Sequence, residues 1–172
     1  VYAAAVKLCE AWYFVPTVFT ASLFPAIISA KQKNEELYKI LRLRAEIFIL
    51  EQDCVYQDLD NSDQKALHLF ANQEGQLLAY ARILQPGVKY SEASIGRIIT
   101  RENMRGLGIG QLLVNESITQ CINRWPKVSI SISAQLRLET FYSKLGFQTV
   151  SSPYLEDDIP HIKMSLQSAS IS

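Results

Sequence analysis

The sequence predicts a mixed α/β fold in which helices pack against a β-sheet. Helix-like segments alternate with strand-like ones, in the order helix, hairpin, strand, helix, strand, helix, strand. The 172 residues suit one domain with its own core better than two domains. We expect the elements at residues 34–52 (helix), 66–73 and 76–84 (hairpin), 94–100 (strand), 109–124 (helix), 127–134 (strand), 136–145 (helix) and 161–166 (strand).

The first predicted helix has a polar start and an apolar face. Asn34 is a favoured N-cap residue, and Glu35 and Glu36 place negative charge where the helix dipole favours it. Apolar residues recur at helical spacing: Leu37, Ile40, Leu41, Ile47 and Phe48. Arg44 lies in the middle of that face, and a buried cation needs a partner. We expect Glu51 to point the same way if the helix continues.

Strands and turns follow. Glu74 and Gly75 separate the runs ALHLFANQ and QLLAYARIL, which predicts a hairpin, and SIGRIIT is the third strand. Pro126 ends the helix predicted over 109–124. The run KVSISISA alternates apolar residues with serine, as a strand does.

In the next segment Leu138, Phe141, Tyr142 and Leu145 are spaced as on one helix face. Gly146 is a typical residue to end that helix.

Charge and cysteine content exclude several classes of protein. Seventeen basic residues balance 17 acidic ones and no basic cluster occurs, so we expect no nucleic-acid partner. Cys9, Cys54 and Cys121 are far apart and lack C-x-x-C spacing. They indicate reduced thiols in a cytoplasmic protein, and neither a disulfide framework nor a zinc site. Two histidines without clustered Cys, Asp or Glu predict no metal site.

The N-terminal region contains an apolar segment. Residues 11–30 carry no charge over the length of a membrane span, but Pro16 and Pro25 interrupt them. We therefore expect no membrane association, with a membrane-tethered protein as an alternative. We divide the chain into an apolar extension of unknown role, residues 1–24, and a domain over residues 25–172.

Three of the seven glycines lie in RGLGIG, residues 105–110, between a predicted strand and a predicted helix. Such a junction presents free backbone N–H groups and the positive end of a helix dipole, which together bind phosphate. A Walker loop is excluded because Gln111 follows Gly110, and the spacing G-x-G-x-G does not fit the dinucleotide fingerprint. The alternative is a tight turn without a ligand.

These residues also carry a family resemblance. Arg105-x-x-Gly108-x-Gly110 resembles the R/Q-x-x-G-x-G/A pyrophosphate loop of the GNAT superfamily of N-acetyltransferases, and TFYSKLGF resembles that family's Y-x-x-x-G-F segment. Several segments look like the ElaA-like branch: RAEIFILEQDCVYQDLD, LLAYARIL, IGRIITRENMRGLGIGQLL, AQLRLETFYSKLGF and DDIPHIKMSL. The resemblance covers residues 34–167. It implies the GNAT acyl-CoA acyltransferase fold, a mixed, mostly antiparallel sheet that is splayed at the cofactor and has helices on both faces.

The resemblance implies that an acetyl group passes from acetyl-CoA to a primary amine by direct attack in a ternary complex, without a metal. It implies a cofactor site at Ile98, Ile99, Thr100, Arg105, Gly106, Leu107, Gly108, Ile109, Gly110, Gln111, Gln135 and Tyr142. In that site the backbone of residues 98–100 contacts pantetheine, and the amides of residues 106–111 bind pyrophosphate. Tyr142 is the candidate general acid, although its position also fits a core tyrosine.

The general base and the acceptor site are less defined. The base candidates are Glu51, His68 and His161, and the substrate-binding candidates are Arg44, Glu51, Gln52, Tyr80 and Arg82. A structural ion pair between Arg44 and Glu51 explains both residues equally well. The loop over residues 51–63 is acidic without Lys or Arg, so it either attracts a cationic amine or is simply solvated.

We expect the acceptor to be a small-molecule or peptide amine. The alternative is a non-catalytic acyl-CoA-binding sensor or interaction module of the same fold, and acetyl transfer to amines would separate the two. The sequence leaves a homodimer open and does not identify the acceptor.

Overall fold

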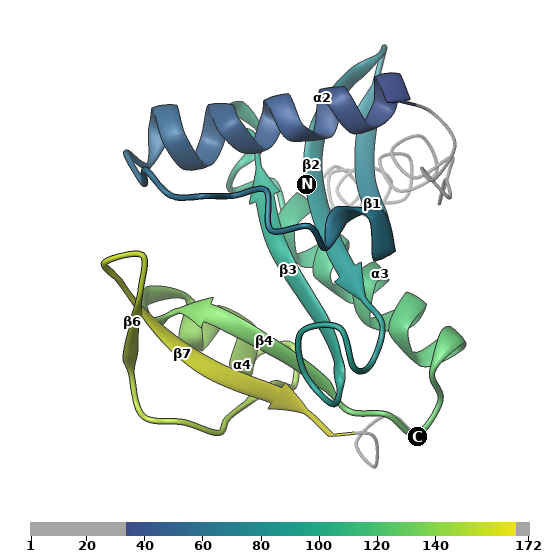
Figure 1. Cartoon of the computed structure of the whole chain (residues 1–172), viewed down its shortest axis with the longest axis vertical. Helices are drawn as coiled ribbons and strands as arrows, with labels where there is room; N and C mark the ends of the chain where they lie inside the picture. The colour runs from purple at the N-terminus through teal and green to yellow at the C-terminus, as the bar shows by residue number, and fades with distance from the viewer. Residues whose placement is uncertain (1–33, 168–172) are drawn as a thin grey trace, which may run out of the picture.

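The computed structural model describes residues 34–167 and shows an open sheet with helices against both faces (Figure 1). The strands are β1 (Ala66–Gln73), β2 (Gln76–Leu84), β3 (Ala93–Thr100), β4 (Ile130–Gln135), β5 (Gln148–Thr149), β6 (Tyr154–Glu156) and β7 (Ile159–Leu166). Their order is β1-β2-β3-β4-β7-β5, and β6 also pairs with β7. Of the pairs in this sheet, β3–β4 is parallel and the others are antiparallel. The predicted mixed, mostly antiparallel architecture is confirmed.

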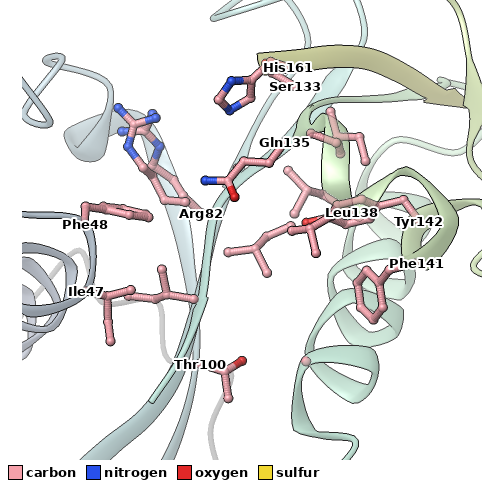
Figure 2. A pocket seen from close by; sticks show the side chains of 18 of the residues that line it. Ile47, Phe48, Arg82, Thr100, Ser133, Gln135, Leu138, Phe141, Tyr142 and His161 are labelled. Carbon is pink, nitrogen blue, oxygen red and sulfur yellow. The ribbon is translucent and has the colours of Figure 1, made fainter. Parts of the chain in front are cut away.

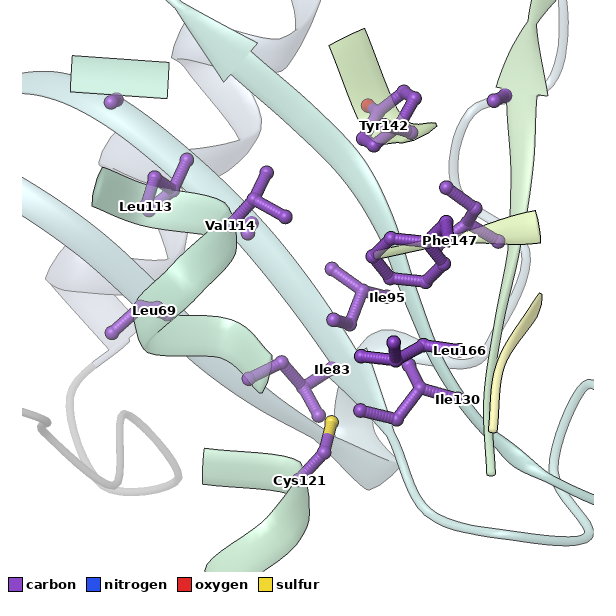
Figure 3. Packing of buried hydrophobic residues seen from close by; sticks show 14 of the residues in the cluster. Leu69, Ile83, Ile95, Leu113, Val114, Cys121, Ile130, Tyr142, Phe147 and Leu166 are labelled. Carbon is purple, nitrogen blue, oxygen red and sulfur yellow. The ribbon is translucent and has the colours of Figure 1, made fainter. Parts of the chain in front are cut away.

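Two apolar cores lie on opposite faces of the β1–β3 half of the sheet. Because side chains alternate along a strand, Leu69 and Phe70 of β1 enter different cores. Leu69 packs with Leu113 of α3 (Ile109–Arg124), in the core that Figure 3 shows. Phe70 packs with Ile40 of α2 (Asn34–Ala45). Alternate side chains of the strands thus pack against α3 on one face of the sheet and against α2 on the other, as predicted for helices on both faces.

The β1–β2 hairpin forms as predicted. Glu74 and Gly75 have φ angles of 51° and 82°, and a two-residue type I′ turn requires positive φ at both central positions. The turn pairs Gln73 with Gln76, and a register shift between Ala71 and Asn72 then places His68 opposite Arg82 and Phe70 opposite Tyr80.

The sheet splits between β3 and β4. These strands pair at Ala93 with Ile130 and at Ser94 with Ser131, and beyond those positions they diverge (Figure 1). Just past the split, Arg97 has a left-handed φ of 52°, and the register of β2 against β3 shifts there. Such a bulge bends a strand and increases its twist, so it helps turn β3 away from β4. The splay implied by the family resemblance is present.

The first predicted helix continues through residue 51 but changes its winding. After Ala45 the chain forms the π-helical turn η2 (Glu46–Glu51). The wider winding breaks the spacing that would align Glu51 with Arg44. The predicted pair between these residues is therefore wrong: Arg44 binds Asp58 at 2.9 Å and Asp63 at 2.6 Å, whereas Glu51 binds Arg105.

Arg44 belongs to a network that we call the Arg–Asp cluster. Its members are Arg44, Arg82, Arg97, Asp58, Asp60 and Asp63. Asp63 binds both Arg44 and Arg82, and Asp58 binds both Arg44 and Arg97. The arginines come from α2, β2 and β3, and the aspartates from the loop that follows η2 and from η3 (Asp63–Lys65). The cluster therefore attaches that loop to the sheet.

Asp58 and Asp60 of the cluster are ionised. Burial alone would raise the pKa of Asp58, but the hydrogen bond and charge of Arg44, with the charge of Arg97, outweigh burial and hold the pKa below its ordinary value. The pKa of Asp60 is likewise lowered, since the bonds and charge of Arg82 outweigh its burial. Three cations face three anions, so the cluster is close to neutral as a whole.

The C-terminal half differs from the sequence prediction in several places. The strand expected over 127–134 is β4, shifted to Ile130–Gln135, and its alternating serines do not mark a solvent face because Ser131 is buried. The helix expected over 136–145 is divided into η5 (Leu136–Leu138) and α4 (Glu139–Ser143), and Leu138 is more exposed than its place on an apolar face predicted. Gly146 has the left-handed φ expected after a helix, 92°. Strands β5 and β6 were not predicted.

The apolar extension predicted over residues 1–24, and the segment 11–30 within which a membrane span was considered, lie outside the described residues. Over residues 34–167, no helix is long and apolar enough to cross a membrane.

We expect Arg44→Met to destabilise the protein by about 3–5 kcal/mol, because it leaves Asp58 and Asp63 buried with one cation fewer. Arg42→Met is the matched control on the same helix. Arg42 is 68 % exposed in its pair with Glu46, so its loss should cost less than about 1 kcal/mol. Urea unfolding of the two variants measures both values, and equal midpoints would contradict the structural role of the cluster.

Candidate functional site

A cleft of about 980 Å³ occupies the gap between the diverging strands. Figure 2 shows Ile47, Phe48 and Arg82 on one side of it and Phe141 and Tyr142 on the other. Residues 94–100 of β3 and 132–135 of β4 line the gap, and the loop over residues 105–111 closes one end. The cleft lies where β3 and β4 no longer pair with each other. Backbone groups of these strands, as well as side chains, therefore face the cleft.

The glycine loop leaves the start of α3 open. Gly108 is the N-cap of this helix, no side chain caps it, and the first turn carries no acidic residue. Gly106 and Gly108 have φ angles of 75° and 80°, and a Cβ at either position would meet open space. The start of α3 therefore lines the cleft with amides that no side chain caps and with the positive end of the helix dipole, which suits a phosphate ligand.

Most of the residues predicted to bind the cofactor meet in this cleft. They are Ile98, Ile99, Thr100, Arg105, Gly106, Gly108, Ile109, Gly110, Gln111, Gln135 and Tyr142. Leu107 is 60 % exposed and does not line the cleft. Arg105 binds the Glu51 carboxylate at 2.6 Å and the Thr100 carbonyl at 3.2 Å. Glu51 lines the same cleft, so this pair forms part of its wall.

Tyr142 has the environment of a protonated phenol. It is 5 % exposed and packs edge-on against Phe141 and Phe147. Burial raises its pKa to about 12, so the phenol keeps its proton at neutral pH. It belongs to the core on the α3 side and also lines the cleft. The two readings of this residue, core tyrosine and proton donor, are compatible.

The two histidines are in different places. His68 is buried outside the cleft lining, with Nε2 donating to the Asp63 carbonyl at 3.0 Å and Nδ1 2.8 Å from the Tyr80 hydroxyl. Because a carbonyl only accepts, the proton of the neutral ring is on Nε2, and Nδ1 accepts from Tyr80. Burial lowers the pKa of His68, so the ring is neutral. Both ring nitrogens are therefore occupied, which argues against the predicted role as a base.

His161 is the histidine in the cleft. Its Nδ1 donates to the Ile159 carbonyl at 2.8 Å, and its ring stacks on Tyr154 of β6. With the proton of the neutral ring on Nδ1, Nε2 carries a lone pair. His161 lies opposite Gln135 of β4, and Figure 2 shows the two side chains close together at the cleft. The ring is thus held in the tautomer that a proton acceptor needs.

The predicted substrate contacts are divided between the core and the cleft. Arg44 and Tyr80 are fully buried and do not line the cleft. Arg82 does line it, but its guanidinium is bound to Asp60 and Asp63. Gln52 lines it as well, and its Oε1 accepts a hydrogen bond of 3.4 Å from Gln135 Nε2. That bond joins the two walls of the cleft.

The acidic loop is mostly not free to attract a cation. Asp58, Asp60 and Asp63 are held by arginines in the Arg–Asp cluster, and Glu51 is held by Arg105. The arginines that neutralise these carboxylates lie outside the loop. The acidic sequence of residues 51–63 therefore did not show that its charges are paired. Within residues 34–167, no group of His, Cys, Asp and Glu is placed to hold a metal ion.

Sequence reasoning missed the β6–β7 hairpin and with it Glu156, which lines the cleft beside His161. Asp157 and Asp158 form its turn with φ angles of 51° and 60°. Aspartate tolerates this conformation, so the paired aspartates between strand-like residues were the signal that could have predicted the turn.

Comparison with known proteins agrees with this architecture. A family model described as an acetyltransferase (GNAT) domain matches residues 30–168. The chain is 39 % identical to Protein ElaA of Escherichia coli over 132 residues, which are 76 % of this chain and 86 % of that protein. A crystal structure of an acyl-CoA N-acyltransferase from Pseudomonas aeruginosa is 40 % identical, with a TM-score of 0.76, and the match covers 79 % of this chain and 93 % of that one. The crystal structure of E. coli ElaA matches with a TM-score of 0.75 and 36 % identity, over 80 % of this chain and 94 % of that chain.

We expect His68 to stay neutral and protonated at Nε2 as the pH falls through about 6.5, the ordinary histidine value. The pKa of His68 is lower in the folded state than in the unfolded state. His68 therefore stabilises the fold at a pH above its unfolded-state pKa, and this contribution is lost as the pH falls through its folded-state pKa. Long-range nitrogen–proton NMR correlations report the tautomer and the titration, with His68→Gln assigning the signal. Titration of His68 at or above the ordinary value would contradict its buried, bonded state.

Proposed function

The chain belongs to the GNAT acetyltransferase family, and from that premise we propose that it transfers an acetyl group from acetyl-CoA to a primary amine. The observation that carries the proposal is the cleft itself, in which an uncapped helix N-terminus and a protonated phenol line one space between splayed strands. The acceptor is a small-molecule or peptide amine.

The residues present fit coenzyme A. The amides at the start of α3, with the glycines before them, are open to a pyrophosphate. Residues 98–100 of β3 line the cleft beyond the point where β4 pairs with this strand, which suits their backbone to the amides of pantetheine. Arg105 contributes a cation at the loop, where it is shared with Glu51. The cosubstrate supplies the activated thioester, and the protein supplies binding and proton transfer.

Two side chains of the cleft serve the proton transfers. His161 accepts at Nε2 a proton from the acceptor ammonium, directly or through water, and the free amine attacks the acetyl carbonyl. As the N–C bond forms and the C–S bond breaks, Tyr142 donates its phenolic proton to the departing thiolate. The proton that the new amide nitrogen then loses restores the phenol, directly or through water. No covalent intermediate with the protein is needed. The bond of Nδ1 to the Ile159 carbonyl leaves Nε2 of His161 for this step, and burial keeps the phenolic proton on Tyr142.

His161 is a better candidate for the base than Glu51 or His68. Both carboxylate oxygens of Glu51 lie within 2.8 Å of the Arg105 guanidinium, so both are already engaged by a cation of the chain. His68 is enclosed outside the cleft. Glu51 remains close enough to contribute to acceptor binding, since it lines the same space.

We expect Gly108→Val to reduce CoA affinity at least tenfold, because a β-branched side chain would fill the open space before the α3 amides. Gly75→Val is the matched control: Gly75 has nearly the same φ, 82°, and also open space, but it lies in the β1–β2 turn, away from the cleft lining. Calorimetric titration with CoA measures both. Equal CoA affinity of the two variants would contradict the pyrophosphate assignment.

The function is tested by acetyl transfer to a panel of primary amines in single-turnover experiments with wild type and Tyr142→Phe. We expect transfer by the wild type and a rate about a hundredfold lower for the variant, with CoA affinity nearly unchanged, since only the phenolic proton is lost. A variant rate equal to wild type would make Tyr142 a core residue only. CoA binding without transfer to any amine would favour the alternative, a non-catalytic acyl-CoA-binding module.

A further inference from the structure

Glu156 is a carboxylate of the cleft that the proposed reaction does not use. It lies on β6 with its side chain 35 % exposed, and it lines the cleft together with His161. The Ser133 hydroxyl of β4 donates a hydrogen bond to its Oε2, and Ser133 also contacts the Tyr154 hydroxyl at 2.5 Å. The carboxylate is thus anchored through one oxygen to the neighbouring strand, while the other oxygen, Oε1, is directed elsewhere.

That second oxygen faces an ammonium group of the chain itself. Lys89 Nζ lies 3.6 Å from Glu156 Oε1, and both side chains are 35 % exposed. A charge-assisted hydrogen bond is about 2.7–2.9 Å long, and exposed pairs of this kind contribute little to stability. Lys89 also lines the cleft, with its Nζ 5.4 Å from the centre of the Tyr90 ring. It is a loosely held primary ammonium, which a ligand can replace.

Two other charged groups of the cleft walls are more firmly paired. Glu51 is bound by Arg105 at 2.6 Å, and Arg97 is bound by Asp58 at 2.6 Å. Burial alone would raise the pKa of Glu156, but the Ser133 hydrogen bond and the charge of Lys89 outweigh it and lower the pKa, so the group is anionic at neutral pH. Glu156 is therefore a fixed negative charge whose present partner is weak.

The hairpin sets the distance between Glu156 and His161. Glu156 pairs across the strands with Ile159, and Tyr154 pairs with His161. Glu156 and His161 are thus diagonal neighbours on one face, a relation that places residues about 7–8 Å apart. A short aliphatic chain spans such a distance, so one molecule can reach both side chains with a nitrogen at each end.

We propose that Glu156 binds a second ammonium group of the acceptor in the place of Lys89, so that the preferred acceptors are short diamines whose other amine is presented to His161. The inference rests on the proposed acetyl transfer and adds the substrate class. In this arrangement Glu156 selects the acceptor, while the amine that reacts is the one beside His161.

The test compares diaminobutane with its matched monoamine, butylamine, as acceptors for wild type and Glu156→Gln. We expect the wild type to prefer the diamine in kcat/KM by at least tenfold, and Glu156→Gln to lose most of this preference through a higher KM for the diamine. Glu156→Asp should restore part of it. Lys89→Met should act in the opposite direction and lower the KM for the diamine, because the resident cation is gone. An unchanged ratio in Glu156→Gln, or no preference in the wild type, would overturn the proposal.

Glu92→Gln is the control for a general loss of charge. Glu92 is also acidic, but it bonds Ser91 and does not line the cleft, so its replacement should leave both acceptors unaffected. Calorimetric binding of diaminobutane to the CoA complex gives a readout without turnover. If no amine is acetylated, the proposed function fails. The proposal on Glu156 then stands if wild type binds the diamine at least tenfold tighter than Glu156→Gln does. It falls if the two proteins bind the diamine alike.

Discussion

The structure depends on the point at which β3 leaves β4. Two paired positions hold the halves of the sheet together, and beyond them each strand presents backbone that its neighbour no longer satisfies. Buried backbone groups need partners, so this gap suits a ligand that can pair with the strand backbone. The bulge at Arg97 directs β3 away, and the glycine loop follows directly from the end of the same strand. The helix N-terminus and the strand backbone are therefore placed along one path.

The Arg–Asp cluster holds one wall of that gap in position. Three arginines from three elements bind aspartates from the segment after η2, and each buried charge depends on the others for its partner. Losing one member leaves its partners buried with less compensation for their charge, which is costly. The acidic loop thus attaches η2 beside the cleft. Glu51, the last residue of η2, and Gln52, the next residue, both line the cleft.

The chemistry of the cleft follows from how each polar group is held. Burial keeps Tyr142 protonated, and a backbone carbonyl occupies Nδ1 of His161, which leaves Nε2 as the ring nitrogen available in the cleft. A histidine with the opposite tautomer, His68, is used in the core to link Tyr80 to the backbone of Asp63. The same side-chain type serves structure in one place and is available for chemistry in another, because the atoms around it differ.

The sequence by itself determined the family and most of the elements. Periodicity, the Glu74-Gly75 turn and the glycine spacing are local signals, and local signals predicted α3 at its observed bounds and most of the residues that meet in the cleft. Only the tertiary structure decided which charges are free. Arg44 pairs with Asp58 and Asp63 because a π-helical turn moves Glu51 out of line, and Glu156 reaches the cleft because an unpredicted hairpin lies beside β4. Pairing between distant segments depends on where the strands place them, and no spacing along the chain encodes that directly.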